Sequence, residues 1–104
     1  MINVAIYGQN KSEPKVGEAP PASARPVNND EVLIQNVAVA SNPKDWKMGQ
    51  WNLYPTDEFI DGDDVAGIVV EVGSDVKEFK KGDRVGAFTY MVRDSKYGGY
   101  QPLT

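Results

Sequence analysis

Short runs in which apolar and polar residues alternate dominate the chain, and no segment keeps a helical period over three turns. A change of phase at Gln35-Asn36 predicts a bulge in the second of these runs, and Gly67 marks a bulge or a close backbone approach in the third. Strands separated by glycine and proline predict an all-β sandwich or small barrel. The predicted strands lie at residues 4–7, 31–40, 65–72 and 84–88.

One short helical turn is predicted after residue 41. Asn42 suits the N-cap and Pro43 suits the first helical position. Asp45 lies in the first turn, where the positive end of the helix dipole favours a carboxylate. Gly49 is expected to end the turn.

Three segments carry no regular period. Residues 11–30 contain four prolines and predict an extended surface segment. Residues 50–62 predict a polar and aromatic loop. Residues 90–104, which include Gly98-Gly99 and Pro102, are expected to lack order.

Composition and charge exclude several classes of partner. A chain of 104 residues can bury about 65% of its extended surface, which predicts one core and one domain. Eleven basic against fifteen acidic residues give a net charge of −4, so we expect no nucleic-acid partner and no anionic membrane partner. No run approaches the ~18 apolar residues of a membrane span and no signal peptide opens the chain, so a cytoplasmic protein is expected.

The chain contains no cysteine and no histidine. Disulfides, thiolate nucleophiles, the Ser-His-Asp triad and the usual zinc ligands are therefore excluded. Any chemistry must use carboxylates, lysine, tyrosine, backbone amides or a cofactor.

The densest group of charged residues is acidic. If this group formed a calcium-binding loop that starts at Asp57, Gly62 would fall at the position that requires glycine. Phe59 and Ile68, however, would fall at positions that need oxygen ligands. No neighbouring residue type would make one of these carboxylates a general acid and another a general base. A solvated acidic loop is the favoured interpretation, and its members are Asp57, Glu58, Asp61, Asp63 and Asp64.

Two further features leave alternatives open. Lys44, in the first helical turn, could meet an anion at the helix N-terminus or be an ordinary surface lysine. Several aromatic residues could line a ligand groove or anchor the core, namely Trp46, Trp51, Tyr54 and Phe59. The chain has no glycine-rich dinucleotide-binding or phosphate-binding motif. The residues taken one by one do not decide the function.

The order of four segments resembles the N-terminal GroES-like domain of the medium-chain dehydrogenase/reductase superfamily. The Asn42-Pro43 turn places the chain nearer the quinone oxidoreductase and trans-acting enoyl reductase branch than the alcohol dehydrogenases. The resemblance extends from residue 4 to about residue 88, and it implies an all-β, partly open barrel with one short helical turn. The segments are residues 30–34, 40–47, 64–73 and 79–85.

The sequence departs from the family in two ways. Zinc-dependent relatives have a cysteine where this chain has Asn42 and a His-Glu pair at Asp63-Asp64, so the zinc-independent branch is implied and no metal site is expected. Family members also continue into a Rossmann domain with an NADP site, whereas this chain stops at Thr104. We therefore expect residues 1–104 to be one GroES-like domain that is incomplete at its C-terminus.

The resemblance implies a function for this domain. It would be the substrate-side part of a zinc-independent, NADPH-dependent reductase that transfers hydride to the activated C=C bond of an enone or enoyl thioester, and it would be inactive alone. Asn42 and Lys44 are expected to face the cofactor or the thioester, and Trp51 and Tyr54 to wall the substrate pocket. The alternative function is a non-catalytic β-barrel binding or regulatory module. Because strands that close the barrel would be missing, we also expect self-association through exposed strand edges.

Overall fold

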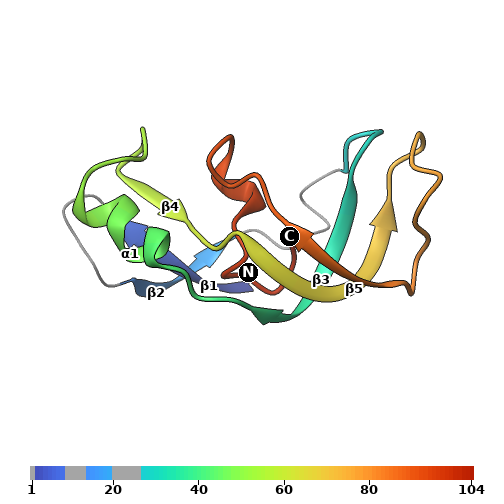
Figure 1. Ribbon diagram of the computed structural model, residues 1–104, viewed down its shortest axis with the longest axis horizontal. Helices are drawn as coiled ribbons and strands as arrows, with labels where there is room; N and C mark the ends of the chain where they lie inside the picture. The colour runs from blue at the N-terminus through green and yellow to red at the C-terminus, as the bar shows by residue number, and fades with distance from the viewer. Residues whose placement is uncertain (1, 9–13, 20–26) are drawn as a thin grey trace.

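The computed structural model describes residues 2–8, 14–19 and 27–104, which form two three-stranded antiparallel sheets and one α-helix (Figure 1). The first sheet has the order β2-β1-β4, with β1 at Ile2–Gly8, β2 at Lys15–Ala19 and β4 at Glu58–Ile60. The second has the order β3-β5-β6, with β3 at Val32–Val39, β5 at Asp64–Val72 and β6 at Arg84–Phe88. The two sheets do not close on each other, which confirms the expected all-β, partly open GroES-like architecture. The helix α1 spans Pro43–Gln50.

The central strand β5 alternates as the pattern predicts. Val65, Gly67 and Val69 are buried, and the residues between them are more exposed. A Cβ atom on Gly67 would lie 2.1 Å from the backbone oxygen of Gln35, which confirms the predicted close approach. The register between β3 and β5 shifts on both sides of Gln35-Asn36, so the predicted bulge is confirmed as well.

The helix begins as predicted and ends slightly later than predicted. The Asp45 carboxylate accepts a hydrogen bond of 2.8 Å from the backbone N–H of Asn42. Gly49 lies inside α1, because Trp51 still donates its backbone N–H to the Lys47 carbonyl. The chain leaves the helix through Asn52, which has a φ of 54°.

Two of the three aperiodic segments contain a strand. Residues 50–62 include β4, which pairs with β1 through Ile6 and Ile60 and buries Phe59 to 2% exposure. Residues 11–30 include β2, which pairs with the other edge of β1. The hydrophobic pattern did not predict these strands, because runs of three to five residues show too little alternation. The predicted extended segment otherwise falls mainly on residues 11–13 and 20–26, which lie outside the described residues.

The expectation that residues 90–104 lack order is wrong. Thr104 exchanges two backbone hydrogen bonds of 2.7 and 2.9 Å with Ile34, and Leu103 bridges to Gln35. Ala5 of the first sheet donates its N–H to the Tyr100 carbonyl at 3.0 Å. This C-terminal segment, drawn in orange to red, lies between the two sheets and joins them (Figure 1).

The two consecutive glycines in this segment make the passage possible. A Cβ atom on Gly98 would lie 2.2 Å from the Ile60 oxygen, and one on Gly99 would lie 2.6 Å from a Val65 methyl carbon. The glycines therefore allow the segment to run against the β4–β5 turn, although the sequence predicted no order for the segment that contains them. The segment covers part of one edge of β3 within its own chain. Self-association through the remaining edges stays a prediction.

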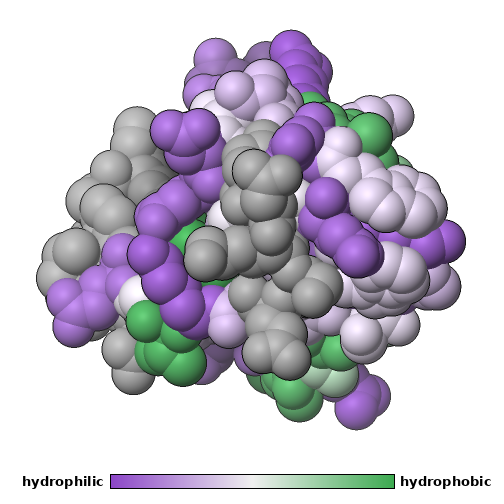
Figure 2. Space-filling model, turned by 90° about the vertical axis from the view of Figure 1, so that its left-hand side faces the viewer, coloured by the Kyte–Doolittle hydropathy of each residue, from purple (hydrophilic) through white to green (hydrophobic). Residues whose placement is uncertain are grey.

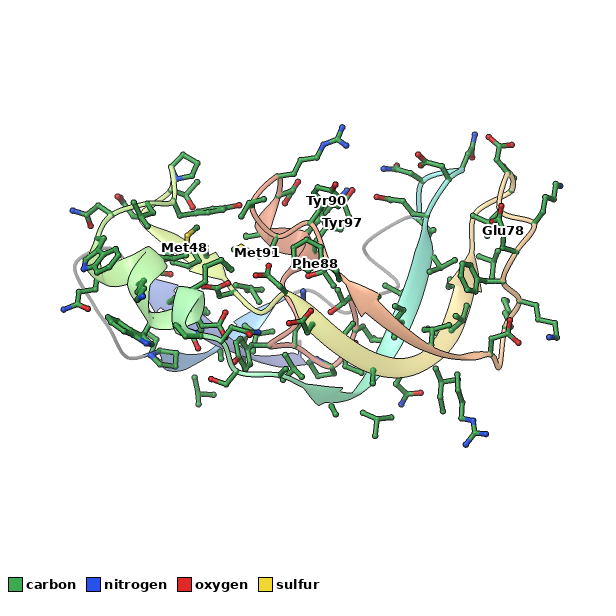
Figure 3. The ribbon with its side chains drawn as sticks, in the orientation of Figure 1. Met48, Glu78, Phe88, Tyr90, Met91 and Tyr97 are labelled. Atoms are coloured by element: carbon green, nitrogen blue, oxygen red, sulfur yellow. The ribbon has the colours of Figure 1, made fainter. Side chains whose placement is uncertain are left out.

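One hydrophobic core cluster lies between α1, the first sheet and the C-terminal segment. Its buried members are Tyr7, Met48, Tyr54, Phe59 and Met91. Met48 of α1 and Met91 of the C-terminal segment lie close together in this core (Figure 3). Phe88, Tyr90 and Tyr97 gather where β6 ends, and the Tyr97 hydroxyl donates a hydrogen bond to Glu31. No helix in the described part of the chain is long and apolar enough to cross a membrane.

Asn36 holds the C-terminal segment in place, and this gives a first test of the fold. Its side-chain nitrogen lies 3.1 Å from the Gly99 oxygen, 2.8 Å from the Gln101 oxygen and 2.7 Å from the Thr104 hydroxyl. Asn36→Ala is expected to lower the free energy of unfolding by about 1–3 kcal/mol, because it removes the amide donor that these three acceptors share. Amide hydrogen exchange should accelerate in residues 98–104.

The control for this prediction is Gln35→Ala, because Gln35 is the exposed neighbour of Asn36 on β3. It should leave both the unfolding free energy and the exchange pattern close to those of the wild type. Equal effects of the two substitutions would contradict the role of Asn36.

Candidate functional site

The acidic turn between β4 and β5 is buried, not solvated. Asp61 is 0% exposed and Asp63 is 6% exposed, so the expected solvated loop is wrong for both. The C-terminal segment covers this turn: Tyr100 donates its N–H to the Asp61 carbonyl at 3.0 Å, and Gly99 donates to Gly62 at 2.8 Å. The remaining acidic residues of the group are exposed as expected, namely Asp57, Glu58 and Asp64.

The Lys44 ammonium lies among three buried carboxylates. Its Nζ atom is 2.5 Å from Asp61 Oδ1, 3.2 Å from Asp63 Oδ2 and 4.0 Å from Asp45 Oδ1. The Lys44 side chain is 29% exposed, whereas the three carboxylate side chains are at most 9% exposed. We call Lys44, Asp45, Asp61 and Asp63 the Lys44 cluster. It joins the start of α1 to the β4–β5 turn.

Residues that follow β6 complete the surroundings of the cluster. Met91 Sδ lies 3.3 Å from Lys44 Nζ, and the Tyr100 hydroxyl donates to Asp45 Oδ2 at 2.8 Å. Thr89 donates its hydroxyl to the Gly62 carbonyl at 2.9 Å and its N–H to the Asp63 carbonyl at 2.6 Å. Sequence reasoning missed these contacts, because they depend on how a segment without periodicity returns to the turn.

In this cluster the pKa values of both Lys44 and Asp61 are raised. Burial by itself lowers the pKa of Lys44, but hydrogen bonds and charges from Asp61 and Asp63 outweigh it, and the pKa lies above its ordinary value. Burial raises the pKa of Asp61, and hydrogen bonds from Lys44 and Gly62 offset only part of that effect. The pKa of Lys44 is thus raised by its carboxylate partners, whereas the pKa of Asp61 is raised mainly by burial.

The predicted residues Asn42 and Lys44 lie together at the start of α1. The Asn42 side-chain amide donates to Asp64 Oδ2 at 3.0 Å, and Asp64 is exposed. Lys44 instead points at the buried carboxylates of its cluster. One end of α1 thus presents a polar amide and a half-buried ammonium side by side.

The structure does not bring Trp51 and Tyr54 together with this pair. Tyr54 is 6% exposed and packs on Phe59 in the core, with ring centroids 4.8 Å apart. Trp51 is 55% exposed and meets Trp46 edge to face, and Lys47 Nζ lies 5.4 and 5.3 Å from the two indole rings. Figure 2 views the end of the molecule that carries α1, where apolar surface appears only in small separate patches among polar side chains.

Two hollows lie elsewhere on the described surface. One of ≈280 Å³ is lined by β3, the end of β6 and the C-terminal segment, including Phe88, Tyr90 and Tyr97. The other, of ≈370 Å³, lies between the first sheet, β3 and the same segment. None of the four predicted site residues lines either hollow. A substrate pocket walled by Trp51 and Tyr54 therefore stays a prediction.

The fold and the order of its segments agree with a known family. Residues 28–101 match the alcohol dehydrogenase GroES-like domain. The chain belongs to this family. The matched range begins just before β3 and includes the whole Lys44 cluster.

Individual relatives are reductases and dehydrogenases. The chain is 48% identical over 82 residues to the trans-enoyl reductase RAP2 of Pyricularia oryzae, which covers 78% of this chain and 22% of that protein. It is 40% identical, over an alignment of 113 positions, to the dehydrogenase pigH of Monascus ruber. This alignment covers 98% of this chain and 30% of that protein. The chain thus spans less than a third of the length of these relatives.

A solved structure gives the same assignment. The quinone oxidoreductase of Escherichia coli, solved in complex with NADPH, superposes with a TM-score of 0.69 at 29% identity. The match covers 99% of this chain and 29% of that one. These relatives place the domain in the medium-chain dehydrogenase/reductase superfamily, among enoyl and quinone reductases.

Proposed function

We propose that this chain is the substrate-side domain of an NADPH-dependent reductase that acts on the activated C=C bond of an enone or enoyl thioester. The observation that carries the proposal is the 48% identity to a trans-enoyl reductase over 78% of the chain. In such a reaction NADPH supplies the hydride that adds to the β-carbon. Negative charge then develops on the carbonyl oxygen of the substrate, where positive charge and hydrogen-bond donors at the domain edge would stabilise it.

The start of α1 is the edge proposed to face the cofactor and the thioester. Asn42 offers a half-buried side-chain amide there, and Lys44 contributes a positive charge that the buried carboxylates keep protonated. Trp51 is exposed and free to form one wall of a site shared with a second domain, whereas Tyr54 would support that wall from the core. Because the chain has no glycine-rich phosphate-binding turn, the cofactor site is proposed to lie mainly in the second domain.

The experiment is a chimera in which this chain replaces the matching N-terminal part of a related trans-enoyl reductase. The isolated chain is expected to show no steady NADPH oxidation with a simple enone or quinone, because most of the cofactor-binding energy would come from the second domain. The chimera is expected to oxidise NADPH in the presence of the enone, at a rate that a metal chelator leaves unchanged.

Two outcomes would count against the proposal. Steady NADPH oxidation by the isolated chain would contradict its proposed inactivity. A folded chimera that binds NADPH but does not respond to the enone would favour the alternative function, a non-catalytic binding or regulatory module.

A further inference from the structure

The donor set of this chain does not fit the zinc ion that some members of the family carry. One relative of this chain, cipB of Emericella nidulans, is named a zinc-binding alcohol dehydrogenase domain-containing protein. The chain has no cysteine or histidine. The residues at the positions where zinc-dependent relatives have their ligands have other partners here: Asn42 donates to Asp64, and Asp63 lies against Lys44. No thiolate or imidazole can complete a tetrahedral zinc site here.

The Lys44 cluster nevertheless has the geometry of a cation site. One carboxylate oxygen from each of Asp45, Asp61 and Asp63 lies within 4.8 Å of the other two, and all three residues are buried. Oxygen ligands at such spacing suit a hard cation. Asp45 Oδ1 is buried without a hydrogen-bond partner, and it lies 4.0 Å from Lys44 Nζ.

We propose that Asp45, Asp61 and Asp63 form a cation site whose permanent occupant is the ammonium group of Lys44. The ammonium makes short contacts with two of the carboxylates and faces the third, as a bound ion would. It also ties the start of α1 to the β4–β5 turn and to Met91 of the C-terminal segment. The chain therefore carries its own positive charge among these three carboxylates, and chelators cannot remove it.

The proposal makes Lys44→Ala a metal-binding variant. Removing the ammonium leaves three buried carboxylates without a cation, so the variant is expected to bind one Mn²⁺ per chain at least about tenfold more tightly than the wild type does. Isothermal titration with Mn²⁺ measures the affinity and the stoichiometry. The double variant Lys44→Ala/Asp63→Asn, which removes one of the three ligands, should lose this gain.

Chemical rescue gives a second measurement. Lys44→Ala removes the atoms of an n-propylammonium ion, so this ion should raise the thermal midpoint of the variant more than that of the wild type. Neutral n-propanol, which has nearly the same size and shape, should not do so. If the variant is unfolded alone, it is expected to fold when Mn²⁺ or n-propylammonium is added.

The outcomes that would overturn the proposal are distinct from those that concern the reductase function. They are a wild-type chain that keeps one Mn²⁺ or Zn²⁺ after dialysis against chelator, a folded Lys44→Ala chain that binds no Mn²⁺, and a variant that stays unfolded with both cations. Equal effects of n-propylammonium and n-propanol would also count against it. All of these measurements use the isolated chain and need no activity.

Discussion

Lys44→Met is expected to lower the free energy of unfolding by about 3–5 kcal/mol, because it breaks a buried ion pair and leaves the carboxylates uncompensated. Asp61 is fully buried and would lose its 2.5 Å contact with the ammonium. Methionine keeps most of the volume of the lysine side chain, so the loss measures charge and not packing. Urea unfolding near neutral pH gives the value.

The pH dependence of this loss identifies its cause. Burial already raises the pKa of Asp61, and removal of Lys44 raises it further, so the native state of the variant holds this proton more tightly than the unfolded chain does. The stability of Lys44→Met should therefore increase as the pH falls from about 7 towards about 5. In the wild type the raised pKa of Lys44 acts at the other end of the scale: its contribution is complete below the ordinary lysine pKa and is lost as the pH rises through the folded value.

The matched control is Lys77→Met, because Lys77 is exposed and makes no ion pair among the described residues. It is expected to change the unfolding free energy by no more than ~0.5 kcal/mol. If the two substitutions cost the same, or if low pH does not restore Lys44→Met, the Lys44 cluster does not stabilise the fold electrostatically.

Gly67→Ala is expected to destabilise the second sheet by about 3 kcal/mol or to prevent folding, because the new methyl group meets backbone. Its Cβ atom would lie 2.1 Å from the Gln35 oxygen and 2.8 Å from an Ile34 methyl carbon. Both atoms belong to β3, so the two strands must separate at the bulge. Urea unfolding and amide hydrogen exchange in β3 and β5 measure the effect.

Gly86→Ala on the neighbouring strand β6 is the control. Its Cβ atom would meet only the Val65 oxygen, at an ordinary 3.9 Å, so stability is expected to stay the same or to rise slightly. A Gly67→Ala chain as stable as Gly86→Ala would show that β3 and β5 do not approach each other as closely as described.

Two of the four residues of the Lys44 cluster, those on α1, could be placed from the sequence, because local signals define the start of the helix. The turn Asn42-Pro43 and Asp45 carry the signals that start a helix, and these depend only on neighbouring residues. Lys44 could therefore be placed in the first turn of α1. Its partners could not, because Asp61 and Asp63 are 17 and 19 positions away in a segment whose charge suggested exposure.

The sequence by itself determined the β-rich class, the four strands that alternate clearly, the bulge in β3, the close approach at Gly67 and the absence of zinc-type ligands. These follow from alternation, glycine and composition, which are properties of short stretches. Only the tertiary structure decided that the C-terminal segment joins the two sheets and buries the acidic turn. Contacts such as Ile34 to Thr104 and Tyr100 to Asp61 connect residues far apart in the chain, and a carboxylate becomes buried and paired only when a distant segment excludes water from it.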